Sequence, residues 1–326
     1  MSQIKKIAVL TSGGDSPGMN AAIRAVARTG FYYNMEVYGI MRGYQGLIDN
    51  DMIKLDNHKV SNIIQRGGTI LKSERSKQFE TKEGRKIAYE NLKAHNINAL
   101  IVIGGDGTFT GADVFCEEYD FQVVGIPGTI DNDLYGTDYA LGYDTAINTV
   151  VDAVDKLRDT AGSHDRLFFV EVMGRDAGFI ALRSGIATGA EDILIPETAT
   201  CIDDLIAKLK HDRRENKTSG IIMVAEGDDA GNAYEVARKV NENFQGYETR
   251  VTVLGHVQRG GAPTCMDRVL ASTLGYEAVR SLLSEQSGVM IGKINNQIQY
   301  TSFKKSTKHH KVVNKSMLDM ARILSL

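Results

Sequence analysis

The chain has little of what marks a secreted or membrane protein. Its 326 residues contain only three cysteines, Cys116, Cys201 and Cys265, whose wide separation argues against a disulfide framework or a zinc site. We expect them to be small buried side chains in a reducing compartment. No apolar run is long enough to span a membrane, and the early run Ile7–Leu10 is too short for a signal peptide. The sequence therefore predicts a soluble cytoplasmic protein without a membrane partner.

The chain also lacks an excess of positive charge. The net charge is −3, whereas proteins that bind nucleic acid in general need a basic surface, so we expect no nucleic-acid partner. The composition is that of an ordinary globular protein, with 42% hydrophobic and 24% charged residues and no low-complexity tract. A chain of 326 residues is long for a single core, which favours two domains.

What the chain does contain is a series of short apolar runs that end at glycine or charged residues. Strands are expected at Ile7–Leu10, Glu36–Ile40, Ala99–Ile103, Val123–Ile126, Leu167–Val172, Gly220–Ala225 and Val251–Leu254. Helices are expected at Met19–Arg28, Gly84–Ala94 and Thr145–Leu157. This alternation predicts an α/β fold with parallel sheets covered on both faces. Ligands bind beyond the carboxyl ends of such strands, where this chain concentrates its glycines and charges.

The central segment is Gly125–Asp133, which follows the apolar run Phe121–Val124. Asp131 and Asp133 lie two residues apart, so both would point the same way in an extended segment. Two carboxylates at such a short distance raise each other's pKa, unless nearby cations or hydrogen-bond donors offset their repulsion. The alternative is a solvated turn, because Asn and Asp favour turns for local reasons.

Two glycine-rich turns indicate phosphate binding. Gly13–Asp15 and Gly104–Thr108 each lie between an expected strand and helix, where backbone N–H groups and the helix dipole favour an anion. Neither matches the P-loop or the dinucleotide fingerprint, and a single glycine turn is usually only a turn. Asp106 would repel a phosphate unless a cation lay between them, so Asp106 is the candidate ligand for Mg²⁺.

Cationic side chains form a second group. Arginine's planar fork suits phosphate, and several cations at equivalent strand ends suggest a site for multiply charged phosphates, although any single arginine is more often a surface residue. The candidates in or beside strand-end loops are Arg75, Arg166, Arg175, Arg250, Arg259 and His256. Glu226 among them would accept hydrogen bonds from sugar hydroxyls. Arg24 and Arg28 share a helix face that is ordinarily solvated, and Lys304–Lys311 is expected to be a solvated surface segment.

Taken together, five motifs closely resemble the bacterial ATP-dependent 6-phosphofructokinase family of the short-subunit type. They are Thr11–Asp15, Gly104–Thr108, Pro127–Asp133, Met173–Arg175 and Leu254–Gly261. NAD kinases and lipid kinases carry something similar to Gly-Gly-Asp-Gly-Thr alone, but the five motifs in this order are very specific. The resemblance runs from Ile7 to roughly Leu283 and weakens in the C-terminal tail.

The resemblance implies a glycolytic kinase that transfers the γ-phosphoryl of Mg-ATP to fructose 6-phosphate. Asp131 would be the general base that accepts the proton of the sugar 1-hydroxyl, with Thr129 and Asp133 supporting that site and Arg175 stabilising the transferring phosphoryl. Mg-ATP would be held by Gly14, Arg75, Gly105, Asp106, Gly107 and Thr108. Fructose 6-phosphate would be held by Thr129, Asp131, Met173, Gly174, Arg175, Glu226, His256 and Arg259. Arg166 and Arg250 would reach into a neighbouring subunit's sugar-phosphate site, which implies a homotetramer.

The implied fold is two doubly wound, Rossmann-like domains with parallel-rich sheets and an active site in the cleft between them. Each domain would be discontinuous. The ATP-binding domain would comprise residues 1–141 and 257–307, and the fructose-6-phosphate-binding domain residues 142–256 and 308–326.

Two glycines bear on the phosphoryl donor. Pyrophosphate-dependent relatives commonly carry Asp at the position of Gly107 and Lys at that of Gly128, where the extra side chains would occupy the space of the ATP α-phosphate and nucleoside. Both positions are glycine here, which favours ATP. The alternatives are a pyrophosphate-dependent enzyme, a nucleotide or lipid kinase, and a catalytically silent sensor of sugar phosphates or nucleotides.

The resemblance also implies an effector site between subunits for ADP or phosphoenolpyruvate. Its positions match Arg24, Arg28, Arg158, Glu191 and Lys217. Nearby, Asn57-His58 stands where relatives have Arg-Tyr, and Glu215–Ser219 replaces a more basic stretch. Fewer cations weaken anion affinity because each lost contact is a charge-assisted bond. We therefore expect an altered or poorly responsive site, whose effector and sign do not follow from the sequence.

Overall fold

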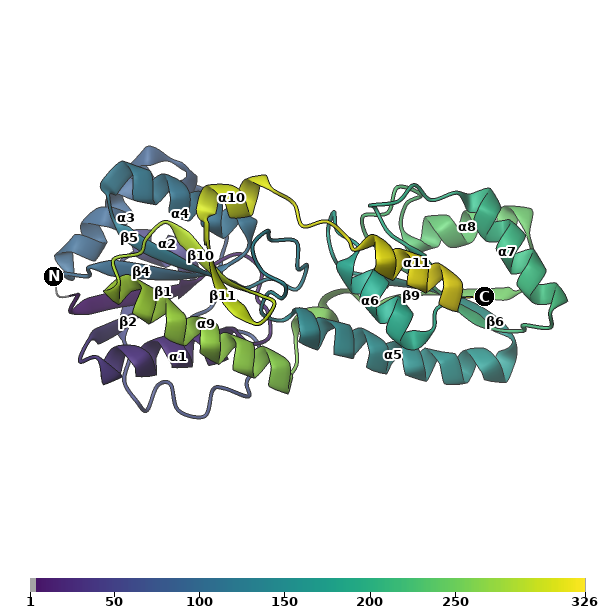
Figure 1. Cartoon of the computed structure of the whole chain (residues 1–326), viewed down its shortest axis with the longest axis horizontal. Coiled ribbons are helices and arrows are strands. Elements are labelled where there is room, and N and C mark those ends of the chain that lie inside the picture. Colours follow the sequence, from purple (N-terminus) through teal and green to yellow (C-terminus); the bar gives the residue numbers. More distant parts are fainter. Residues whose placement is uncertain (1–3, 326) are drawn as a thin grey trace. The chain divides into compact units, whose positions relative to one another are not determined.

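The computed structural model describes residues 4–325, which divide into two units, each with its own sheet (Figure 1). Unit 1 contains the residues up to Ile130, Leu134–Thr145 and Arg259–Lys311. Unit 2 contains Asp131–Asp133, Ala146–Gln258 and the residues from Val312 onward. The chain therefore passes between the units more than once, so that each is discontinuous in sequence.

Unit 1 is built on a seven-stranded sheet with the order β11-β10-β5-β4-β1-β2-β3. Its strands are β1 (Lys6–Thr11), β2 (Glu36–Ile40), β3 (Met52–Lys54), β4 (Ala99–Gly104), β5 (Gln122–Pro127), β10 (Val289–Ile294) and β11 (Gln297–Ser302). The neighbouring strands β10, β5, β4, β1 and β2 run parallel to one another. The strands at the two edges, β3 and β11, each run antiparallel to the strand beside them. All six residues of β4 are buried, as expected for a strand with helices on both faces.

Helices cover both faces of this sheet. The helices are α1 (Met19–Tyr32), α2 (Gly43–Ile48), α3 (Lys82–Ala94), α4 (Asp106–Tyr119), α9 (Cys265–Leu283), α10 (Phe303–Lys308) and the short 3-10 helix η1 (Gln78–Glu80). Alternate residues of β4 point to opposite faces, so that Ile101 joins a core with α1 and α9 while Val102 joins a core with Phe109 of α4. The two cores hold the carboxyl ends of β1, β4 and β5 at one edge of the sheet.

Unit 2 has a four-stranded, fully parallel sheet with the order β7-β8-β6-β9. The strands are β6 (Arg166–Val172), β7 (Asp192–Leu194), β8 (Gly220–Ala225) and β9 (Glu248–Val253). The remaining elements are α5 (Tyr143–His164), α6 (Phe179–Thr188), α7 (Ile202–Arg214), α8 (Ala233–Asn243), the 3-10 helix η2 (Gly255–Arg259) and α11 (Lys315–Leu324). Residues of α7 and α8 pack on Phe169 and Ile222, whereas α6 packs on Ile193 and Met223 from the opposite face (Figure 1). The predicted α/β fold with two doubly wound units is confirmed.

Two local expectations were wrong, and a third was confirmed. Cys201 and Cys265 are exposed, because they lie at the amino-terminal ends of α7 and α9, and only Cys116 is partly buried. The basic stretch Lys304–Lys311 is a surface segment as expected, since Lys304, Lys305, Lys308, His309 and His310 are exposed, although Ser306 within it is buried. The last expected strand begins at Glu248 rather than Val251, because β9 is a partly exposed edge strand that carries polar residues.

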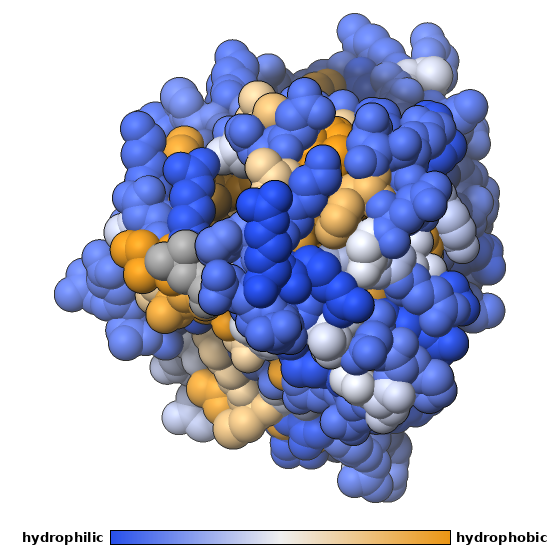
Figure 2. Space-filling view, turned by 90° about the vertical axis from the view of Figure 1, so that its right-hand side faces the viewer, coloured by the Kyte–Doolittle hydropathy of each residue, from blue (hydrophilic) through white to orange (hydrophobic). Residues whose placement is uncertain are grey.

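The surface agrees with the composition. In the part of the chain from residue 4 to residue 325, no helix is both long and apolar enough to cross a membrane. The face shown in Figure 2 is mainly hydrophilic, with apolar side chains in scattered groups, as on most folded proteins.

Candidate active site

In unit 1, hydrogen bonds join the loops that follow β1, β4 and β5. The amide of Ser12 donates to the Ile103 carbonyl at 3.0 Å, and the amide of Gly128 donates to the Gly104 carbonyl at 2.9 Å. The Thr108 hydroxyl, in turn, donates to the Ser12 carbonyl at 3.2 Å. β2 and β4 flank β1 on opposite sides, so the chain reverses its winding here, and ligands bind at such a switch point.

The glycines of these loops differ in what an added side chain would meet. A Cβ on Gly104 would lie 2.3 Å from Thr108 Oγ1 and 2.5 Å from the Ser12 carbonyl oxygen, so no side chain fits there. Gly13 has a φ of +84°, which favours glycine. A Cβ on Gly107, by contrast, would have nothing within 4 Å. The space at the start of α4 is therefore open, and it faces the end of a helix that attracts anions.

Asp106 is the first residue of α4 and lies between these glycines. Among residues 4–325, no group of three or more His, Cys, Asp or Glu is arranged to hold a metal ion. Mg²⁺ in phosphate sites does not need such a group, because it takes one or two carboxylates and completes its shell with phosphate oxygens and water. A single carboxylate beside an anion-binding helix end fits this mode of binding.

A fourth loop, which contains Arg75, is fixed against the first. Asn20, only 1% exposed, donates to the Arg66 and Gly67 carbonyls at 3.1 Å and accepts from the Ile70 amide at 2.7 Å. Ser73 donates to the carbonyl of Gly13 at 2.6 Å. Neither residue was predicted from the sequence, although Asn20 is a polar residue within an apolar helical run and could have been singled out for that reason.

The segment after β5 is not extended as expected. Asn132 has a φ of +55°, a left-handed conformation that Asn adopts readily. The argument that Asp131 and Asp133 point the same way by strand alternation was therefore wrong. Asp131 is 3% exposed, whereas Asp133 is only partly buried, so the two carboxylates have different surroundings.

Arg259 lies beside the first glycine turn. Its Nη1 donates to the Asp15 carbonyl at 3.3 Å, and a Cβ on Gly14 would come within 2.5 Å of the same nitrogen. Gly14 therefore makes room for the guanidinium group. Arg259 was expected to hold the sugar phosphate, and the structure places it next to a loop that was expected to hold ATP.

In unit 2, the loops after β6, β8 and β9 meet at one edge of the sheet. Glu226 Oε1 accepts from the amides of Gly174 at 3.1 Å and Arg175 at 2.7 Å. Gln258, which is fully buried, accepts from the Met173 amide at 3.2 Å and donates to the Gly255 carbonyl at 3.0 Å. These bonds gather Met173–Arg175, Glu226 and the helix η2 that contains His256. Gln258 was not identified as a site residue, although it lies inside a motif that was.

The loop at Arg175 has an unusual backbone. Arg175 has a φ of +55°, and a Cβ on Gly227 would lie 2.1 Å from its carbonyl oxygen. A non-glycine residue in this region costs free energy, and such residues are often found at functional sites. The two bonds to Glu226 stabilise the conformation and hold the exposed Arg175 side chain at the carboxyl end of β6.

Arg166 and Arg250 do not belong to the same edge as Met173, and their placement among the strand-end loops was wrong. Arg166 is the first residue of β6, and Arg250 pairs in register with Phe168 near the start of that strand. At about 3.3 Å per residue, Arg166 lies roughly 20 Å from the carboxyl end of β6. Both arginines pair with Glu248, and the hydrogen bond from Arg166 is the main cause of the lowered pKa of Glu248.

The expected effector residues fall in both units. In unit 1, Arg24 and Arg28 are on α1, and burial, followed by the charge of Arg28, lowers the pKa of the Arg24 guanidinium. An anion bound between these two like charges would relieve their mutual repulsion.

In unit 2, Arg158 donates to the Thr188 and Gly189 carbonyls, at 2.7 and 2.8 Å, and so caps the carboxyl end of α6. Its Nη1 also lies 3.5 Å from Glu191 Oε1. Lys217 instead lies 3.7 Å from Asp212 Oδ1. The structure thus brings Arg158 and Glu191 together and gives Lys217 a different partner.

Comparison with known proteins places these loops in a family. The phosphofructokinase family model matches residues 6–282. The chain is 52% identical to ATP-dependent 6-phosphofructokinase 2 of Bacteroides thetaiotaomicron over the full length of both proteins. It is 53% identical to ATP-dependent 6-phosphofructokinase of Cytophaga hutchinsonii, covering 99% of this chain and 98% of that protein. A solved phosphofructokinase structure from Saccharomyces cerevisiae matches 93% of this chain and 45% of its own, with a TM-score of 0.89 and 39% identity. The chain belongs to the phosphofructokinase family.

Proposed function

We propose that this enzyme transfers the γ-phosphoryl group of Mg-ATP to the 1-hydroxyl of fructose 6-phosphate in glycolysis, releasing fructose 1,6-bisphosphate and ADP. The observation that carries the proposal is the identity of at least 52%, over nearly the whole chain, to two proteins named ATP-dependent 6-phosphofructokinase. The arrangement of glycines and charged side chains in the strand-end loops also supports the proposal. Phosphoryl transfer depends on the positioning of the reactants and on electrostatics rather than on covalent catalysis.

The carboxyl ends of β1, β4 and β5 hold the nucleotide in this proposal. The amides at the start of α4 receive phosphate oxygens, and the open space at Gly107 admits them. The nucleotide-binding residues are Gly14, Arg75, Gly105, Asp106, Gly107 and Thr108. Asp106 holds Mg²⁺, which, when bound, neutralises charge on the β- and γ-phosphates.

The carboxyl ends of β6, β8 and β9 hold the sugar phosphate. The residues assigned to it in this subunit are Thr129, Met173, Gly174, Arg175, Glu226, His256 and Arg259. Asp131 accepts the proton of the 1-hydroxyl, and Thr129 and Asp133 support it. Arg175, held by Glu226 through its backbone, places a guanidinium group where negative charge develops on the transferring phosphoryl.

The donor is ATP rather than pyrophosphate. The open space at Gly107 supports this choice, because it leaves room for the α-phosphate and nucleoside of ATP, which an aspartate side chain there would occupy. A Cβ on Gly128 would lie 3.1 Å from Ile103 Cγ2 and Met19 Cε, so a lysine at this position would have to displace its neighbours.

A coupled assay with fructose 6-phosphate and Mg²⁺ tests the function directly. We expect turnover with ATP and none with pyrophosphate. Turnover with pyrophosphate instead would show that Gly107 and Gly128 do not select the donor. Binding of both ligands without turnover would favour the silent sensor. The same assay with added ADP tests the effector site formed by Arg24, Arg28, Arg158, Glu191 and Lys217.

The proposed assembly is a cytoplasmic homotetramer. Arg166 and Arg250 lie at the amino edge of the unit 2 sheet, so they serve the sugar phosphate of a neighbouring subunit rather than their own. To bind a phosphate, the two arginines break their ion pairs with Glu248 and pair with the ligand instead. The partners are ATP or ADP, fructose 6-phosphate and other copies of the chain, without nucleic acid or membrane.

A further inference from the structure

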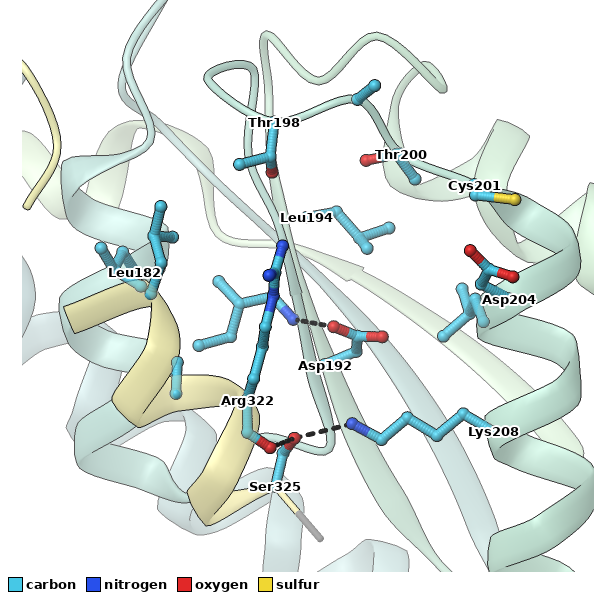
Figure 3. A pocket seen from close by; sticks show the side chains of 15 residues that line it. Leu182, Asp192, Leu194, Thr198, Thr200, Cys201, Asp204, Lys208, Arg322 and Ser325 are labelled. Atoms are coloured by element: carbon cyan, nitrogen blue, oxygen red, sulfur yellow. Dashed lines mark hydrogen bonds between the residues drawn. The ribbon is translucent and has the colours of Figure 1, made fainter. Parts of the chain in front are cut away.

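A pocket of about 360 Å³ opens in unit 2 at the edge strand β7, with walls from α6, α7 and α11 (Figure 3). Its volume falls within the range of roughly 300–1,000 Å³ that is typical of small-molecule sites. No residue assigned above to ATP, to fructose 6-phosphate or to the effector lines it. It is therefore separate from the proposed active site and needs its own explanation.

The pocket combines an apolar wall with charges of both signs. Leu182, Leu194 and Leu318 supply apolar surface. Arg322 reaches from α11 into the pocket, and Asp204 faces it from α7 (Figure 3). In the described part of the chain, no ion pair joins Arg322 to Asp204 or to the other carboxylate of the pocket. These charges face one cavity without neutralising each other.

The remaining polar groups of the pocket are partly engaged. Lys208 donates to the Glu191 carbonyl and, at 2.7 Å, to the Ser325 hydroxyl. Asp192 Oδ1 accepts from the Ile193 amide at 2.9 Å, which leaves its second oxygen to the pocket. Lys208 keeps its positive charge and a third N–H donor, so one guanidinium group, one ammonium group and two carboxylates are available to a ligand.

This charge pattern selects a class of ligand. A simple anion would pair with Arg322 but would be repelled by Asp192 and Asp204, and a simple cation would meet the opposite problem. A zwitterion satisfies both, since a carboxylate fits the guanidinium fork and an ammonium group pairs with carboxylates. We propose that this pocket binds a small α-amino acid whose apolar side chain packs on the leucine wall.

Cys201 offers a direct readout. It lines the pocket and is exposed, whereas Cys265 is also exposed but lies in unit 1 and serves as an internal reference. Burial raises the pKa of Cys116 to about 12, so this thiol stays protonated and reacts slowly. Iodoacetamide labelling of the full-length protein, followed by mass spectrometry of peptides, measures each rate. We expect L-leucine to slow labelling of Cys201 in a saturable manner and to leave Cys265 unchanged.

Calorimetry with the same probe and two single-charge analogues tests the chemical class. We expect 3-methylbutanoate and 3-methylbutylamine each to bind at least about tenfold more weakly than L-leucine, because each lacks one charge-assisted bond. Equal binding of 3-methylbutanoate would reduce the site to an anion site and overturn the proposal. Absence of both protection and heat with L-leucine would overturn it as well.

Matched variants test the residues. We expect Arg322→Gln and Asp204→Asn each to weaken L-leucine binding by about tenfold. Asp203→Asn is the control for the second change, because Asp203 is in the same turn of α7 but does not line the pocket. Arg214→Gln, at the other end of α7, controls for the loss of an exposed arginine. Controls that weaken binding as much as the test variants would contradict the assignment.

Discussion

The two ends of the unit 2 sheet use arginine and glutamate in different ways. At the carboxyl end, Glu226 accepts hydrogen bonds from the backbone amides of Gly174 and Arg175, and the Arg175 side chain is exposed. At the amino end, Glu248 pairs directly with the side chains of Arg166 and Arg250. One end thus holds a fixed loop that can act within its own chain. The other end holds two cations that, in the proposed assembly, act on the sugar phosphate of a neighbouring subunit.

The largest effect is expected at the carboxyl ends. Asp131→Asn keeps the size of the side chain but removes the proposed base, so kcat should fall by about 10²–10⁴-fold. Binding of fructose 6-phosphate, measured by calorimetry, should persist. An unchanged kcat would remove Asp131 from this role, and the comparison between the two ends would lose its catalytic meaning.

The sequence allowed the fold and the carboxyl-end loops to be predicted because both depend on local pattern. Buried parallel strands are apolar runs, and the chain must turn through glycine where a helix approaches a ligand. The order of residues also contained information that was not used. Arg166 immediately precedes the apolar run of β6, so strand direction alone would have placed it at the amino end.

Other features depend on contacts between distant residues. Asn132 has a left-handed conformation within a loop, and the hydrogen bond that the Met173 amide donates to Gln258 joins residues that follow two different strands. The pocket at β7 forms only when α11, at the end of the chain, packs against α6 and β7. No periodicity or spacing encodes such contacts, and for this reason the C-terminal tail had no predicted role.

The assignment of the amino end to a neighbouring subunit can be tested by mixing variants. Arg250→Gln alone should raise the KM for fructose 6-phosphate by about tenfold or more, because a charge-assisted bond to phosphate is lost. If Arg250 acts across subunits, refolding this variant together with Asp131→Asn should restore part of the activity, since some sites then combine two intact chains.

The control for this mixing experiment is a pair of variants from the same proposed site. Refolding Glu226→Gln together with Asp131→Asn should restore nothing beyond the activity of Glu226→Gln itself, because both residues are assigned to one subunit's site. Recovery in this control, or none with Arg250→Gln, would contradict the division between the two ends.

Glu226→Gln should have a smaller effect on its own. The amide oxygen still accepts hydrogen bonds, but it lacks the charge that strengthens the bonds to the Gly174 and Arg175 amides. We expect kcat/KM to fall by about tenfold with little change in Tm, since Glu226 is exposed. A variant with full activity would show that the Arg175 loop does not depend on this carboxylate.

The smallest effect, and one of opposite sign, is expected at the other end. Glu248→Gln removes a carboxylate with which a phosphate must compete for Arg166 and Arg250, so the KM for fructose 6-phosphate should fall. The decrease should be a few-fold at most, because exposed ion pairs contribute little free energy. Because the arginines hold the pKa of Glu248 below its usual range, wild-type Glu248 stays ionised at neutral pH and the difference from the variant is fully present there. The difference should disappear only as the pH falls through that lowered pKa. A KM that rises in Glu248→Gln would instead mean that the carboxylate positions the arginines for binding, and the amino end would then work by the same principle as the carboxyl end.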